Sequence, residues 1–172
     1  MPTHQINLTL ADESSTENLA RELAQIILKD HAEHPPAQMQ AAAALHLRGE
    51  LGAGKTTFAR AFLRQCGVTG RIKSPTFALL EAYNVSSLNF YHIDFYRFSD
   101  PREWADAGFR DLFQPDSFIL IEWPEKADEA LPAPDVLIQL VDHDPGRIAL
   151  LDARTPRGTR WLNKLKTQHQ GL

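Results

Sequence analysis

Residues 49–56, GELGAGKT, are the stretch of the sequence that most directly indicates chemistry. They match the pattern G-x-x-x-x-G-K-[ST] of a phosphate-binding loop, in which glycines let backbone N–H groups turn toward phosphate oxygens. We expect the mobile ammonium of Lys55 to reach the β- and γ-phosphates and the hydroxyl of Thr56 to ligate Mg²⁺. The alternative, a glycine-rich turn with a surface lysine, is disfavoured because an apolar strand precedes the loop and an amphipathic helix follows it.

A phosphate-binding loop needs a second acid to hold Mg²⁺ or its waters, usually at the end of a neighbouring strand. Asp94 ends the strand region in NFYHIDFYR, and Glu122 ends the apolar run FILIE. A carboxylate at the carboxyl edge of an α/β sheet faces the nucleotide crevice. For Glu122 we favour this role over that of a solvated strand end, because Trp123 and Pro124 predict a stiff turn. For Asp94 the residues alone favour neither.

The identity of the nucleotide base and of a γ-phosphate sensor is less directly encoded. No aspartate has glycine three positions later, and NKLK at 163–166 lacks the aspartate that reads guanine. ATP is therefore the expected nucleotide. Thr76, in KSPTFALLE, follows the loop where nucleotide switches place a threonine that senses the γ-phosphate. A plain turn that opens a strand explains Thr76 equally well.

The elements that must position these residues alternate between strands and helices. Apolar periodicity predicts strands at 4–11, 42–47, 77–83, 88–95, 117–122, 135–141 and 147–153, and helices at 15–33, 55–66 and near 100–109. Ser14 and Glu17 have the spacing of a capping box, and Asp100 is the expected cap of the third helix. We predict a single-domain P-loop NTPase-like α/β fold: a mixed sheet with a parallel core and antiparallel hairpin strands, flanked by helices.

Composition and charge limit the classes of function. The 172 residues suit one domain, and the lone Cys66 predicts a reducing, cytoplasmic setting. No signal peptide and no apolar run of about 20 residues is apparent. All 22 acidic residues precede position 153, which disfavours broad nucleic-acid binding by the body of the chain.

The C-terminal segment has the opposite charge balance. We expect residues 1–153 to form the ATPase domain and residues 154–172 to form a basic tail with five lysines and arginines. Arg157, Arg160 and Lys164 recur at helical spacing beside Trp161 and leucines, which predicts a helix packed on the same domain. A contact with tRNA or with an acidic partner is the alternative.

Four motifs in this order, GELGAGKTT, SPTF, HIDFYR and IEWPE, resemble the bacterial TsaE (YjeE) family over most of the chain. The resemblance implies an atypical P-loop fold without the usual Walker B aspartate. It also implies an ATPase required for N6-threonylcarbamoyladenosine at position 37 of tRNAs that read ANN codons. Such a protein acts with TsaB and TsaD, meets tRNA through that complex, and relies on TsaC for the activated threonylcarbamoyl group.

The resemblance also implies roles for individual residues. Asp94 is similar to an acid proposed for catalysis or Mg²⁺ support, Glu122 to a switch acid near the metal, and Thr76 to a switch residue. Trp123 is expected beside the nucleotide. The nucleotide-binding set implied by the motifs is Glu50, Leu51, Gly52, Ala53, Gly54, Lys55, Thr56, Thr57 and Trp123.

Two other functions are compatible with a phosphate-binding loop. A small-molecule kinase needs an arginine-rich lid, for which Arg102 and Arg110 are the candidates. A non-catalytic, ATP-gated scaffold binds ATP without turnover. For His92, a lone histidine near a strand, we favour a structural role over one in orienting the loop.

Overall fold

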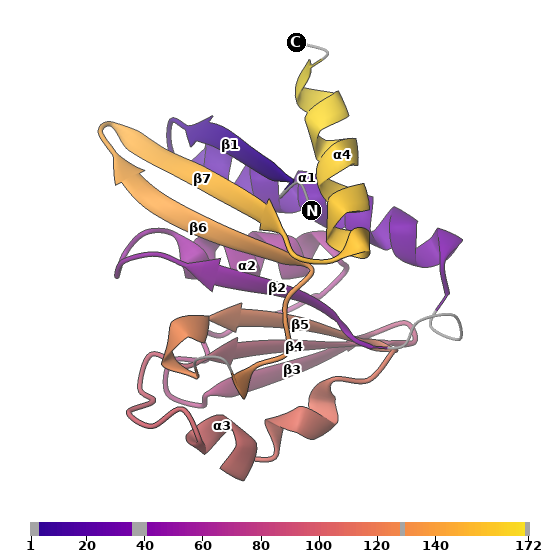
Figure 1. The fold of residues 1–172 in the computed structure, drawn as a ribbon, viewed down its shortest axis with the longest axis vertical. Coiled ribbons are helices and arrows are strands. Elements are labelled where there is room, and N and C mark those ends of the chain that lie inside the picture. The colour runs from indigo at the N-terminus through magenta and orange to yellow at the C-terminus, as the bar shows by residue number, and fades with distance from the viewer. Residues whose placement is uncertain (1–3, 36–40, 128–129, 171–172) are drawn as a thin grey trace.

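One mixed sheet of seven strands organises the chain (Figure 1). The computed structural model describes residues 4–35, 41–127 and 130–170. Its elements are β1 (Gln5–Leu10), α1 (Glu13–Glu33), β2 (Ala43–Arg48), α2 (Lys55–Gln65), β3 (Leu80–Val85), β4 (Leu88–Asp94), α3 (Glu103–Asp106), η2 (Phe109–Leu112), β5 (Ser117–Glu122), η3 (Pro124–Lys126), β6 (Val136–His143), β7 (Gly146–Ala153) and α4 (Pro156–Gln170).

The sheet has the strand order β1-β7-β6-β2-β5-β4-β3, with parallel pairs at its centre and antiparallel pairs at both ends. β2 pairs in parallel with both β5 and β6, and β4 pairs in parallel with β5. β1–β7, β6–β7 and β3–β4 are antiparallel. The predicted parallel core with antiparallel hairpin strands is therefore confirmed, and β5 lies directly beside β2.

Apolar side chains form one core on each face of the sheet. On one face α1, α2 and α4 pack through residues such as Leu23, Phe62 and Trp161 against β2, β6 and β7. On the other face α3 and η2 cover β4 and β5 through Trp104 and Phe109. In Figure 1, α1 and α2 lie behind the sheet and α3 lies below β3. This arrangement leaves the carboxyl ends of β2, β4 and β5 at a common edge.

Three expected boundaries were wrong. Asp12, not Ser14, caps α1, because it has extended backbone at the strand end and its carboxylate accepts from the Ser15 amide at 2.8 Å. The third helix begins at Glu103, because Asp100 instead closes a turn with the Arg102 amide at 2.9 Å. The strand expected from residue 77 begins at Leu80, after a turn in which the Leu79 amide donates to the Pro75 carbonyl at 2.7 Å.

The basic tail is docked by charge and by apolar contact. α4 buries Trp161, Leu162 and Leu165. Arg157 donates to the buried carboxylate of Asp135 at 2.8 Å, and the Thr155 hydroxyl donates to the same group at 2.6 Å. A side chain at Gly158 would collide with the Asp135 carbonyl, so this glycine permits the helix to approach β6 closely. α4 therefore lies against the start of β6 through both polar and apolar contacts.

Candidate nucleotide site

The loop of residues 49–54 turns sharply between β2 and α2. Gly49 has φ of 154°, and a Cβ there would lie 2.8 Å from the Leu140 carbonyl oxygen. Gly54 has φ of 103° and directly precedes Lys55, the first residue of α2. Both positions require glycine. The amino end of α2, with its free N–H groups and positive dipole, therefore faces the loop.

The ammonium of Lys55 spans this loop. Its Nζ donates to the carbonyl oxygens of Gly49 at 2.6 Å and Glu50 at 2.9 Å. It also lies 4.2 Å from the centre of the Trp123 ring. Burial lowers the pKa of the Lys55 ammonium, while the carboxylates of Glu122 and Glu125 act in the opposite direction. The Lys55 ammonium is thus held at the centre of the site by two neutral backbone carbonyls.

The two predicted acids end neighbouring parallel strands and are paired in register. Glu122 is buried; its Oε1 accepts from the Thr56 hydroxyl at 2.8 Å, and its Oε2 lies 2.6 Å from His92 Nε2. Asp94 accepts from the Tyr96 amide at 2.8 Å. Burial raises the pKa of the Asp94 carboxyl, although the Tyr96 hydrogen bond opposes the rise.

The turn that carries Thr76 meets the same edge. The Thr76 hydroxyl donates to Asp94 Oδ2 at 3.2 Å and lies 2.8 Å from the Ser74 hydroxyl. This contact places Thr76 beside the acids rather than on a strand. A loop residue that touches a buried acid can respond to a change at that acid.

Trp123 has an unusual backbone for a bulky residue. Trp123 has φ of 57° and directly precedes η3, whose first residue is Pro124. Its amide donates to the Leu47 carbonyl at 3.2 Å, and its ring centre lies 5.1 Å from that of Tyr96. Strained backbone of this kind costs on the order of 1–3 kcal/mol and persists where packing determines it. The turn after Glu122 is therefore fixed from both sides.

These residues enclose one cleft of about 240 Å³. Its lining is Leu51, Gly52, Gly54, Lys55, Thr56, Thr57, Thr76, Asp94, Tyr96, Glu122 and Trp123. Two residues of the expected nucleotide-binding set do not line it. Ala53 is buried, and Glu50 lines an adjoining hollow of about 500 Å³ together with Trp123 and Val141.

Sequence reasoning missed three neighbours of the site. For His92 a structural role was favoured over one in orienting the loop, and no contact with an acid was expected; it lies two strand positions before Asp94 and contacts Glu122. Tyr96 was part of a motif without a role, and it lines the cleft. Arg147 carried no signal in the sequence, and its NH2 donates to the Gly52 carbonyl at 2.8 Å.

The candidate lid arginines of a kinase are engaged elsewhere. Arg102 pairs with Asp100 at 2.6 Å, and the guanidinium of Arg110 lies 5.1 Å from the centre of the Trp104 ring. Neither residue lines the cleft.

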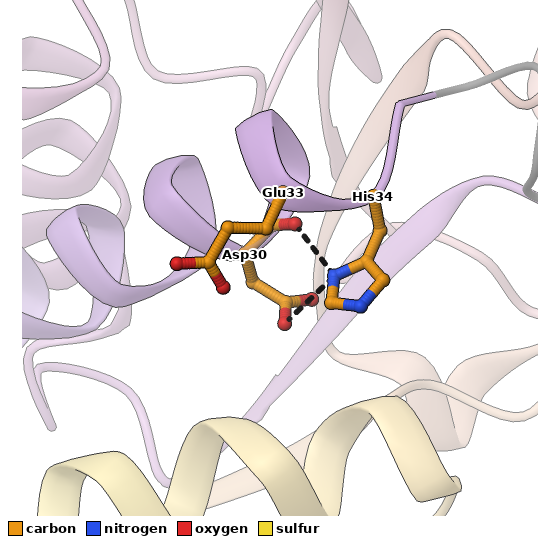
Figure 2. A group of neighbouring side chains, drawn as sticks. All are labelled: Asp30, Glu33 and His34. Carbon is orange, nitrogen blue, oxygen red and sulfur yellow. Dashed lines mark hydrogen bonds and ion pairs between the residues drawn. The ribbon is translucent and has the colours of Figure 1, made fainter.

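Asp30, Glu33 and His34 bring potential metal ligands together at the end of α1 (Figure 2). The buried carboxylate of Asp30 already accepts from Trp161 Nε1 at 2.9 Å and from Arg160 NH2 at 3.2 Å. A cation would compete there with a guanidinium, so this group serves to dock α4. Within the described ranges, no helix is long and apolar enough to cross a membrane.

Comparisons with known proteins agree on one family. The family model "Threonylcarbamoyl adenosine biosynthesis protein TsaE" matches residues 10–149. A tRNA threonylcarbamoyladenosine biosynthesis protein TsaE from Haemophilus influenzae is 41% identical over 149 residues, which cover 87% of this chain and 90% of the relative. One of the same description from Rickettsia felis is 36% identical over 134 residues, with coverages of 77% and 71%. The crystal structure of Bacillus subtilis YdiB has a TM-score of 0.69 at 26% identity and covers 98% and 99% of the two chains.

Proposed function

The chain belongs to the TsaE family, and from this premise we propose that it is a Mg²⁺-dependent ATP hydrolase that acts in threonylcarbamoyladenosine formation on tRNA. The modified base we propose is N6-threonylcarbamoyladenosine at position 37 of tRNAs that read ANN codons. The observation that carries the ATPase proposal is the cleft, because one cavity gathers the loop, Lys55, Thr56 and both predicted acids.

Phosphate can bind at this cleft if Lys55 exchanges its present hydrogen-bond acceptors for phosphate oxygens. Lys55 donates to two neutral backbone carbonyls, and phosphate oxygens offer its ammonium negatively charged acceptors instead. The amino end of α2 supplies further N–H groups. We infer that the triphosphate of ATP lies along the loop and that Trp123 flanks the nucleotide.

The donor set fits Mg²⁺. Thr56 Oγ1 and Glu122 Oε1 are hard oxygen ligands only 2.8 Å apart, and Asp94 is the register partner of Glu122. Bound with ATP, Mg²⁺ would neutralise part of the charge on the β- and γ-phosphates. One of the two carboxylates would accept a hydrogen bond from the attacking water, and the other would hold Mg²⁺ or its water shell. In-line attack on the γ-phosphate gives ADP and phosphate.

We propose that the nucleotide state controls binding to TsaB and TsaD. Thr76 and Trp123 lie in turns that contact the acids, so loss of the γ-phosphate would loosen both turns. The surface around the cleft supports a protein partner. Within the described chain, the large hydrophobic side chains that are exposed are Leu51, Phe77, Tyr96 and Val141, and all four lie at or beside this edge. Exposed apolar groups gathered in this way mark interaction sites.

Two substitutions separate binding from hydrolysis. We expect Lys55→Ala to abolish ATP binding in calorimetry, with Lys126→Ala, an exposed lysine of η3, as the matched control. Glu122→Ala should bind ATP like the wild type but lose hydrolysis when TsaB and TsaD are present, and Glu13→Ala, at an exposed acid of α1, controls for the lost carboxylate. Unchanged ATP affinity in Lys55→Ala would refute the site, and wild-type hydrolysis in Glu122→Ala would remove Glu122 from the reaction. Binding without any turnover by the wild type would favour the ATP-gated scaffold.

A further inference from the structure

The β6–β7 hairpin braces the outer side of the phosphate loop. A side chain at Gly146 would run into the carbonyl oxygens of Leu10 and Ala11, so the hairpin lies directly against the junction of β1 and α1. The backbone position of the next residue, Arg147, is therefore fixed. On the other strand of the hairpin, the Leu140 carbonyl closes against Gly49.

Arg147 reaches from this hairpin to the loop. Its NH2 donates to the Gly52 carbonyl at 2.8 Å, and its NH1 donates to Asp142 Oδ1 at 2.8 Å. Asp142 is its cross-strand partner in the register. The Nε of Arg147 lies 3.6 Å from the point that a Cβ on Gly54 would occupy. One guanidinium thus contacts the loop while a carboxylate on the facing strand holds it in place.

The hydrogen bond to Gly52 controls an amide on the inner side of the loop. The Gly52 carbonyl and the Ala53 N–H belong to one planar trans peptide, so they point in opposite directions. With the carbonyl turned outward to Arg147, the Ala53 amide turns inward and donates to the Glu50 carbonyl at 3.0 Å. Arg147 itself does not line the cleft.

We infer that Arg147 is a positioning residue that holds the phosphate loop in its nucleotide-binding shape. The inference rests on the proposed function, since it assigns a role in the same site. This role requires arginine rather than lysine. The planar guanidinium can donate to Gly52 and Asp142 in different directions, whereas an ammonium on a flexible stem cannot fix both acceptors. The hydrogen bond from Arg147 to Gly52 lies at the surface, and its charged donor makes it stronger than a neutral hydrogen bond.

The test compares Arg147→Met and Arg147→Lys with Arg154→Met. Arg154 directly follows β7 at the end opposite Arg147 and pairs with Asp152 at 2.6 Å, so this control removes an equivalent charge without touching the loop. Hydrogen exchange of amides 50–55 is measured in nucleotide-free protein, and ADP and ATP affinities are measured by calorimetry. We expect Arg147→Met to speed loop exchange about tenfold and to weaken ADP and ATP binding by a similar, about tenfold, factor. Arg147→Lys should show smaller changes in loop exchange and nucleotide affinity than Arg147→Met but still differ from the wild type. Arg154→Met should match the wild type in both measurements.

Three results would overturn the inference. Unchanged loop exchange in Arg147→Met, even with a lower melting temperature, would leave only a general role in stability. A loss confined to ATP, with ADP unaffected, would indicate direct contact with the γ-phosphate. Equal effects in Arg154→Met would attribute the change to charge alone. If the wild type binds no nucleotide, the proposed function fails, whereas the exchange comparison still decides whether Arg147 holds the loop.

Discussion

The Glu122 carboxylate contacts His92 through one oxygen and the Thr56 hydroxyl through the other, and only the second contact is easily replaced. His92 is completely buried beneath it, and the Thr56 hydroxyl lies on the side of the cleft. A carboxylate fixed through one oxygen keeps its orientation while the other oxygen changes partner. This arrangement suits a residue that must exchange a protein hydroxyl for a metal or its water shell.

Thr56→Val tests this exchange at a single position. Valine keeps the shape of threonine but removes the hydroxyl that would bind Mg²⁺. We expect ATP affinity in EDTA to stay near the wild-type value while the gain on adding Mg²⁺ falls about tenfold or more, since one ligand is lost. Calorimetric titration with and without Mg²⁺ measures both quantities. A wild-type Mg²⁺ gain would show that Thr56 is no ligand.

At this scale the sequence predicted residue types better than contacts. Glycines and Lys55 follow a fixed spacing, and strand ends mark Asp94 and Glu122, so the sequence could propose these residues. The contact of Arg147 with Gly52 joins residues 95 positions apart and depends on β6 lying beside β2. No local pattern encodes that neighbourhood.

Among the elements, α4 is held by an ion pair that solvent barely reaches. The side chain of Arg157 is 17% exposed and that of Asp135 is 3% exposed. Arg157→Met would leave a buried carboxylate without its main cation, which typically costs about 3–5 kcal/mol. Arg154→Met breaks a more exposed pair and should cost at most about 1 kcal/mol. Urea unfolding of both variants gives the comparison, and equal losses would contradict the proposed docking of the tail.

On β2, His46 makes stability depend on pH. Burial lowers its pKa to about 3 from 6.5, so the folded protein keeps it neutral where the unfolded chain takes up a proton. The contribution of neutral His46 to the free energy of unfolding is complete above pH 6.5 and is lost as pH falls toward 3. Relative to His46→Leu, the wild type should lose about 1.4 kcal/mol of unfolding free energy between pH 8 and pH 5.5. A difference that stays constant across urea titrations at these pH values would refute the assignment.

Element types were easier to predict than their boundaries. Period-2 and helical apolar patterns identified the strands and long helices because each buries one face. The boundaries depend on competition between nearby polar groups: Asp12 and Ser14 both suit an N-cap, and only the backbone at the end of β1 decides. β3 starts late because a turn closed by the Leu79–Pro75 hydrogen bond precedes it, and this turn also makes a tertiary contact between Thr76 and Asp94.

Across the whole molecule, the basic tail balances acids of the same chain. Arg160 and Lys164 pair with Asp30 and Glu33, and His169 lies 2.7 Å from Glu22. These contacts account for much of the tail's charge without a nucleic acid. The nucleotide edge lies away from this helix, among exposed apolar side chains. We therefore expect partner proteins to bind at the cleft rather than at α4.

The most direct test of the ATPase proposal is reconstitution with TsaB, TsaD, tRNA, threonylcarbamoyl-AMP and ATP. Modified adenosine and released phosphate are measured together, with the wild-type chain, with Glu122→Ala and without the chain. We predict sustained modification and phosphate release only with the wild type. Undiminished modification by Glu122→Ala in the absence of phosphate release would contradict the claim that this cleft acts by hydrolysing ATP.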